Sequence, residues 1–482
     1  MKYYILFISA LLLFSSCEKL LEENPQSIAA ENFYNNPAEV QAGLNAIYTP
    51  IRGGGSMGAL YQIQLEIYTE YMYGRGSHAP LNDYVGLDNT NITRTDGMWT
   101  TFYEAIRNAN IVIQRTPLGT NLNDADRSKF LGEARFLRGL LYFHLVRNWA
   151  GVPLRTENNM DSVNLPRSTK EEIYNFIEAD LLYAEANLPD VPRLPGAPST
   201  WAVKTLLADV YMNMNDYPKA RDKALEVIGS NKFSLVNVMV PDDFDKIFGP
   251  DVQSSTEEIF YLKFSRTPSG QGFEYPMYTH YPGTIYYPPG GYYTLYSDSE
   301  ENSFVKNWDK QDLRYIFNWY AQTFGLSNTT ILSKKFTDKV TNTAGGNDYP
   351  MYRYADLLLF YAESASRANN GPTADAMEKL NMVHRRAYGK NPLVADATVD
   401  FKLSDYSSAQ SFLDLVVKER GYEDCSEGKR WLDLKRMGIA KDVIKAVKGI
   451  TVADKHMLWP IPRIEYNYNK AIDPIKDQNP GY

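Results

Sequence analysis

The chain has 482 residues, 44% of them hydrophobic and 13% aromatic, which is ample for a buried core and argues against disorder. Its net charge of −8 and pI near 5.4 argue against nucleic acid as a partner, because phosphate binding relies on clustered Lys and Arg. The five histidines are scattered, and none is paired with another histidine or a cysteine at metal-ligand spacing, so we expect neither a metal nor a cofactor.

The first residues have the pattern of a secretory signal. Lys2 is followed by an apolar run over 3–14, which leads into two serines and Cys17. The run is shorter than the roughly 20 apolar residues that a spanning helix needs. We predict a signal peptide over 1–16, acylation of Cys17 and a tether over 17–35 that is anchored to the membrane by lipid. The alternative is an ordinary signal peptide with a chance cysteine nearby.

Helical periodicity dominates the N-terminal half. Asn36 and Pro37 predict the N-cap and first position of a helix that ends at Arg52. Apolar spacing predicts a helix around Trp99 and another over 124–149. The next helix start is predicted by a capping box at one of two overlapping positions, Ser168 with Glu171 or Thr169 with Glu172.

Two segments have the spacing of tetratricopeptide helix pairs. The first spans 201–228 with a break at 215–216, and the second is interrupted at 370–372. Small residues such as Ala208 and Ala220 let antiparallel helices approach closely. Such pairs need neighbours that bury their faces, so the earlier helices should complete the stack. The predicted fold class is mainly α, an α/α superhelix of tetratricopeptide-like helix pairs with an irregular loop-rich insertion that contains short strands.

The predicted insertion differs from the helical segments. Strand-like runs at 258–264 and 331–336 are separated by turn-forming residues. The stretch 271–320 contains 15 aromatic residues, and it is interrupted by Pro and Gly, so some of these rings should be exposed. We predict one domain with these approximate limits: 36–482 for the whole, 36–235 and 348–482 for the helical scaffold, and 236–347 for the insertion.

Two catalytic motifs are present only formally. Residues 53–58 spell both a serine hydrolase elbow around Ser56 and a dinucleotide fingerprint, yet both motifs require a preceding strand, and here a helix precedes. We therefore predict a flexible glycine loop. Glu419, Glu423 and Glu427 lie at helical spacing among Lys and Arg, which favours a structural ion-pair network over an acid/base site. No pair of facing carboxylates is indicated, so we expect no catalytic residue.

Five stretches, in this order, carry a resemblance to a known family: EARFLRGLLYFHLVRNWAGVPL (133–154), RYADLLLFYAESA (353–365), LNMVHRRA (380–387), KERGYEDCSEGKRWLDLKR (418–436) and WPIPRIEYNYNKAIDPIKDQNPGY (459–482). Together they resemble the SusD/RagB family. The resemblance implies a tetratricopeptide-like fold and a non-catalytic lipoprotein at the outer face of the outer membrane. It also implies a SusC-like TonB-dependent transporter as partner, which receives a captured glycan or, as in the RagB branch, a peptide.

A sugar binder needs aromatic platforms with polar groups beside them, on loops held by a rigid frame. Two loop regions meet this description. The candidate ligand-binding residues are Tyr71, Tyr73, Arg75, His78 and Asp83 in the first region, and Tyr286, Tyr292, Tyr293, Tyr296, Trp308 and Trp319 in the second. For any one of them the alternative is local packing under a loop. Competing functions are a peptide receptor, a surface glycoside hydrolase and a scaffold without a small ligand.

Overall fold

The structure is a computed structural model that describes residues 33–268, 270–288, 290–341 and 343–482. The predicted signal peptide over 1–16, Cys17 and all but the last three residues of the predicted tether over 17–35 lie outside the described residues. None of the helices in the described residues is long and apolar enough to cross a membrane.

The described chain is mainly helical, which confirms the predicted fold class. The scaffold helices are α2 (Pro37–Arg52), α3 (Leu60–Ile67), α4 (Ala79–Asn82), α5 (Asn89–Arg115), α6 (Asp124–Trp149), α7 (Lys170–Asn187), α8 (Thr200–Asn213), α9 (Tyr217–Gly229), α13 (Tyr354–Ala368), α14 (Ala374–Ala387), α15 (Ala409–Glu423), α16 (Arg430–Arg436), α17 (Ala440–Lys448) and α18 (Arg463–Tyr468). Short 3-10 helices are η4 (Gly76–His78), η5 (Thr116–Leu118), η6 (Pro241–Phe244), η7 (Tyr275–Tyr278), η8 (Leu403–Tyr406) and η9 (Asp454–Met457).

Local signals set several helix ends as predicted. The Asn36 side chain accepts hydrogen bonds from the amides of Ala38 and Glu39, which caps α2. Helix α6 has the limits predicted from its periodicity. Of the two possible capping boxes, Thr169 with Glu172 is the one that forms at the start of α7.

The glycine-rich segment between α2 and α3 is a hydrogen-bonded turn, not a loose loop. Met57 donates its amide to the Ile51 carbonyl at 3.0 Å, and Leu60 donates to Gly54 at 2.9 Å. A Cβ on Gly58 would lie 2.3 Å from the Arg52 carbonyl oxygen, so only glycine fits this close approach. Because the turn joins two helices, it lacks the strand that both formal catalytic motifs require.

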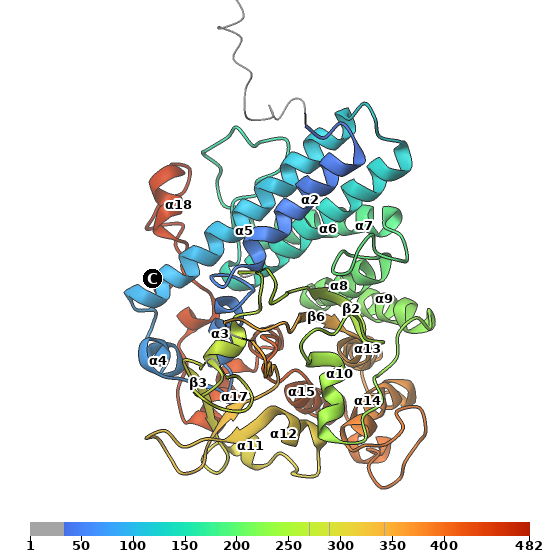
Figure 1. The fold of residues 1–482 in the computed structure, drawn as a ribbon, viewed down its shortest axis with the longest axis vertical. Coiled ribbons are helices and arrows are strands. Elements are labelled where there is room, and N and C mark those ends of the chain that lie inside the picture. Colours follow the sequence, from blue (N-terminus) through green and yellow to red (C-terminus); the bar gives the residue numbers. More distant parts are fainter. Residues whose placement is uncertain (1–32, 269, 289, 342) are drawn as a thin grey trace, which may run out of the picture.

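The helices stack in pairs along the long axis of the molecule (Figure 1). Helices α2, α5, α6 and α7 lie side by side at one end, each packed on the next. The predicted pairs form as α8 with α9 and as α13 with α14, and α13 also packs on α9. These antiparallel neighbours form the superhelical scaffold.

The strands and remaining helices lie mostly between α9 and α13 in the sequence. They are β1 (Tyr73–Gly74), β2 (Glu258–Leu262), β3 (Leu295–Asp298), β4 (Trp319–Ala321), β5 (Thr330–Ser333), β6 (Tyr349–Arg353), α10 (Asp245–Phe248), α11 (Ser303–Lys306) and α12 (Leu313–Asn318). One antiparallel sheet has the order β1-β3-β5-β4, and β2 pairs with β6 in another. The β2–β6 pair joins the predicted insertion to α13. The domain limits themselves stay predictions.

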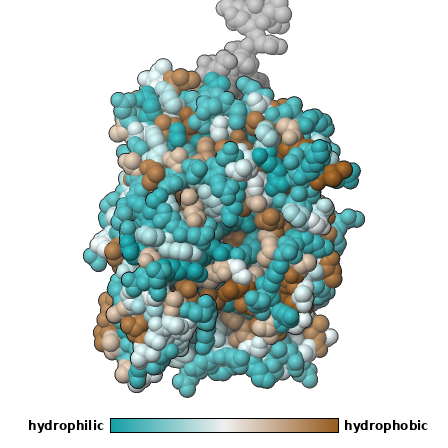
Figure 2. Space-filling view, turned by 180° about the vertical axis from the view of Figure 1, so that it is seen from behind, coloured by the Kyte–Doolittle hydropathy of each residue, from teal (hydrophilic) through white to brown (hydrophobic). Residues whose placement is uncertain are grey.

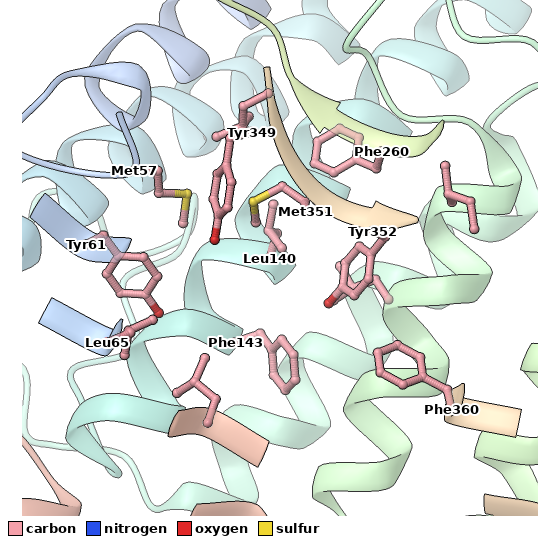
Figure 3. Close-up of a cluster of buried hydrophobic side chains, with 14 of the residues drawn as sticks. Met57, Tyr61, Leu65, Leu140, Phe143, Phe260, Tyr349, Met351, Tyr352 and Phe360 are labelled. Atoms are coloured by element: carbon pink, nitrogen blue, oxygen red, sulfur yellow. The ribbon is translucent and has the colours of Figure 1, made fainter. Parts of the chain in front are cut away.

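The core runs between the helices and the β2–β6 sheet. Figure 3 shows aromatic, methionine and leucine side chains from α3, α6, β2, β6 and α13 that point toward one another, among them Tyr61, Phe143, Phe260, Met351 and Phe360. All of these are buried. Burial of each such side chain stabilises the fold by about 1.5–3 kcal/mol relative to its exposure.

A buried ion-pair network lies beside this core, as predicted for the three glutamates of α15 and the turn after it. Arg314 pairs with Glu419 at 3.1 Å, and Arg353 pairs with both Glu423 and Glu427 at 2.7 Å. Burial alone would raise the pKa of Glu419, but its partners Arg314 and His384 lower that pKa to about 2. The glutamates are therefore ionised structural groups that hold α12 and β6 against α15.

Candidate functional site

Antiparallel pairing of β1 with β3 brings the two predicted loop regions together. Tyr73 is opposite Tyr296 in the register, and their rings stack with centroids 5.4 Å apart and an interplanar angle of 25°. The Asn302 amide donates to the Tyr73 hydroxyl at 3.0 Å and fixes its position. Two segments more than two hundred positions apart in the sequence therefore share one surface.

Arg75 connects the two segments beyond the strands. Its guanidinium lies over the ring of Tyr293, 3.8 Å from the centroid, and its Nε donates to the Tyr293 carbonyl at 2.7 Å. Its Nη2 lies 3.5 Å from the Tyr292 carbonyl, a long hydrogen bond. Arg75 makes no ion pair with any residue that the structure describes, so part of the five-donor capacity of its guanidinium remains for a ligand. Tyr293 has a φ of 38°, a region that non-glycine residues rarely occupy and that often marks a binding site.

Further rings extend this surface. Tyr281 packs on Tyr293 with centroids 4.7 Å apart, Phe324 meets Tyr293 edge-on at 5.0 Å, and Tyr278 lies 5.3 Å from Tyr292. Tyr292 is 55% exposed, and the other rings are partly exposed. We call the aromatic surface the set Tyr73, Arg75, Tyr278, Tyr281, Tyr292, Tyr293, Tyr296 and Phe324.

Two predicted residues lie outside the aromatic surface. Tyr286 packs on Tyr320 at 4.7 Å and lines a small polar pocket with Lys334. Asp83 is exposed and accepts a hydrogen bond from the Asn82 amide at 3.0 Å. Both remain accessible to a ligand, but neither contacts Arg75 or Tyr293 in the structure.

Three predicted aromatic residues are core residues instead. Tyr71 is fully buried and donates its hydroxyl to Glu66 at 2.7 Å. Trp308 is 1% exposed and stacks on Tyr422 with centroids 4.3 Å apart. Trp319, on β4, is 5% exposed. None of these rings presents a face to a ligand, so we leave them out of the proposed site.

His78 is also buried, at 4% exposure. Its Nδ1 lies 3.1 Å from an Arg94 nitrogen, and burial together with Arg94 lowers its pKa to about 3. The imidazole is therefore neutral at physiological pH. It supports the turn after β1 and has no surface for ligand contact, so we leave it out as well.

Four further residues belong to this region and are not among the candidates predicted from the sequence. Tyr278 and Tyr281 lie within the aromatic-rich stretch 271–320, whereas Phe324 lies just beyond it. Lys448, at the end of α17, gave no sequence signal. Its Nζ donates to the Met72 carbonyl at 2.6 Å and to Asn82 at 3.0 Å, beneath the Tyr73 ring. Burial lowers its pKa to about 7. Lys448 thus fixes the loop that presents Tyr73.

No group of three or more His, Cys, Asp or Glu side chains within the described residues is arranged to hold a metal ion. Hydrophilic residues cover most of the face shown in Figure 2, and hydrophobic side chains there form small separate patches.

Two family models match the chain over most of its length. One, described as starch-binding and associating with the outer membrane, matches residues 19–212, and the model of the SusD family matches residues 281–482. The chain belongs to the SusD/RagB family. This confirms the resemblance seen in the sequence, and it rests on both halves of the chain.

Individual SusD/RagB relatives align along nearly the whole chain. SusD-like protein P38 of Formosa agariphila is 26% identical over an alignment of 512 positions, which covers 96% of this chain and 97% of that protein. A SusD homolog from Bacteroides thetaiotaomicron has a TM-score of 0.81 at 22% identity and covers 94% of this chain and 98% of its own. Surface glycan-binding protein A from Bacteroides fluxus has a TM-score of 0.75 at 22% identity, and the match covers 92% of this chain and 99% of that protein. The superhelical scaffold is thus the fold of this family.

Proposed function

We propose that this protein is a non-catalytic lipoprotein of the cell surface that captures an oligosaccharide or polysaccharide and delivers it to a TonB-dependent outer-membrane transporter. The observation that carries the proposal is the aromatic surface, where two distant loops meet through β1 and β3. Family membership and the naming of a relative as a surface glycan-binding protein support it.

The aromatic surface has the chemistry that a sugar requires. Pyranose rings have apolar C–H faces and hydroxyl edges, and tyrosine offers a flat apolar ring beside a hydroxyl. Tyr292 supplies an exposed ring and Tyr293 a partly exposed one, and Arg75 supplies the N–H donors that its bonds to the Tyr292 and Tyr293 carbonyls leave over. Because Lys448 and the Tyr73–Tyr296 stack hold the loops in place, little ordering is needed on binding.

Placement at the membrane is the second part of the proposal. One matching family model is described as associating with the outer membrane, and the apolar run before Cys17 supports lipid anchoring. Mass spectrometry of the mature protein tests the anchor, because acylation at Cys17 should add the mass of several fatty acyl chains. Copurification of a TonB-dependent transporter from solubilised outer membranes tests the partner.

Glycan capture is tested by affinity electrophoresis in gels that contain different polysaccharides. At least one polysaccharide should retard the wild-type protein, and a variant with Tyr292→Ala and Tyr293→Ala should migrate freely. Tyr468→Ala is the matched control, because Tyr468 is 70% exposed on α18 and should not affect migration. The retained polysaccharide should show no new reducing ends. Release of reducing ends, or retention of peptides alone, would contradict the proposal.

A further inference from the structure

A cavity separate from the aromatic surface lies in the scaffold. It is bounded by the C-terminal part of α6, the start of α7, the end of α8, α16 and residues 457–458. Its volume is about 360 Å³, within the range of about 300–1,000 Å³ that is usual for small-molecule sites. No residue of the aromatic surface lines it, so a ligand in this cavity would bind at a site separate from the proposed glycan site.

All the charged side chains that line the cavity are basic. Arg147, Lys170, Lys435 and Arg436 line the cavity together with Tyr174 and Asn213, and no Asp or Glu is among the lining residues. This contrasts with a chain that has 58 acidic and 50 basic residues. Converging cations without carboxylates create a positive potential that attracts an anion.

The carboxylates that neutralise the two arginines lie outside the cavity lining. Arg436 pairs with Glu363 at 2.6 Å, and Arg147 is 3.5 Å from Asp209. Lys170 and Lys435, by contrast, form no ion pair with any residue in the described part of the chain. Lys170 is exposed, so the cavity reaches solvent beside it.

Lys435 is the least compensated of the four cations. Its Nζ donates to the main-chain carbonyls of Arg147 at 2.9 Å and Met457 at 3.2 Å, which leaves one of its three N–H groups available. Lys435 is half-buried, and an ammonium group that is withdrawn from water without a countercharge is costly. Burial, Arg147 and Lys170 accordingly lower the pKa of Lys435 to about 7. The buried Nε of Arg147 also lacks a hydrogen-bond partner.

We infer that this cavity binds a small oxyanion, that is, a carboxylate, phosphate or sulfate group. Such a group would supply the missing negative charge to Lys435 and Lys170. Its oxygens would also accept charge-assisted hydrogen bonds, which are shorter and stronger than neutral ones. The oxyanion can be a free inorganic ion or the carboxylate of an acidic sugar, since both offer the same acceptor chemistry.

Calorimetric titration of the mature protein tests the inference, with sodium phosphate, sodium sulfate, glucuronate and glucose as separate ligands in chloride buffer. Phosphate, sulfate or glucuronate should bind, and glucose should not. Tighter binding of glucuronate would identify a sugar acid as the source, and tighter binding of the inorganic ions would identify a free anion. Both results support an oxyanion site.

Two variants locate the bound anion. Lys170→Gln removes an exposed charge and should fold normally, and Lys435→Met removes the half-buried charge. Each should weaken anion binding roughly tenfold or more, as expected for loss of a charge-assisted hydrogen bond. Lys246→Gln, on α10 and outside the cavity lining, is the control and should bind like the wild type.

Absence of anion binding, or equal affinity in Lys170→Gln and the wild type, would overturn the inference. The Tyr292 and Tyr293 variant should keep anion binding, so failure here is distinguishable from failure of the glycan proposal.

Discussion

Replacing Trp308 by alanine should destabilise the protein, whereas replacing Tyr293 should leave it folded and weaken ligand binding. Aromatic density in the sequence suggested the same role for both residues, but the structure separates them. Trp308 is 1% exposed, stacks on Tyr422 and donates its indole N–H to Asp312 at 2.9 Å. Tyr293 is only partly buried, and Arg75 lies over its ring.

The expected magnitudes follow from these environments. Truncation of a buried tryptophan to alanine costs about 3–5 kcal/mol, a large part of the roughly 5–15 kcal/mol by which proteins are stable. At roughly 2 °C per kcal/mol for a long chain, the loss of about 4 kcal/mol lowers Tm by about 8 °C. For Tyr293→Ala, loss of a central aromatic contact worth about 2 kcal/mol weakens binding roughly thirtyfold.

Differential scanning fluorimetry measures the Tm of both variants, and calorimetry with the retained glycan measures their affinity. Trp308→Phe is the matched control, because it keeps an aromatic ring in the core and should lose less stability than the alanine variant. If Trp308→Ala has the Tm of the wild type but no longer binds glycan, Trp308 is a ligand platform and not a core residue.

Two further predictions concern the buried ion-pair network. Arg353→Met leaves Glu423 and Glu427 without their shared partner and should cost about 3–5 kcal/mol, measurable as a lower urea midpoint. Glu419 has a folded-state pKa of about 2, below its ordinary value of 4.5, so its contribution to stability is complete above about pH 4.5 and is lost as the pH falls toward 2. Urea unfolding between pH 7 and pH 3 should therefore show a smaller acid-induced loss in Glu419→Gln than in the wild type, and equal losses would contradict this.

Much of the helical scaffold could be predicted from local sequence. The limits of α6, the cap at Asn36 and the break between α8 and α9 all follow from short-range chemistry and apolar spacing. Where two signals overlapped, at the capping boxes before α7, the sequence alone could not choose between them. The network around Glu423 was predictable because its charges lie at helical spacing.

The aromatic surface that we propose as the binding site was predictable only in part. Composition indicated that the stretch 271–320 has more aromatic rings than one core-facing stripe can bury, but it could not tell that Tyr293 is partly exposed while Trp308 is buried. That distinction depends on tertiary packing, and in particular on the long-range pairing of β1 with β3. The role of Lys448 was not predictable, because nothing in the sequence around this lysine indicates the distant loop that it supports.

The most direct test is amide hydrogen exchange of the mature protein with and without its retained oligosaccharide. Ligand-dependent protection should be confined to residues 73–83, 278–296 and 320–324, with the helix pairs α8–α9 and α13–α14 unchanged. Protection limited to those helix pairs, with none near Arg75 and Tyr293, would contradict the claim that the paired loops hold the glycan.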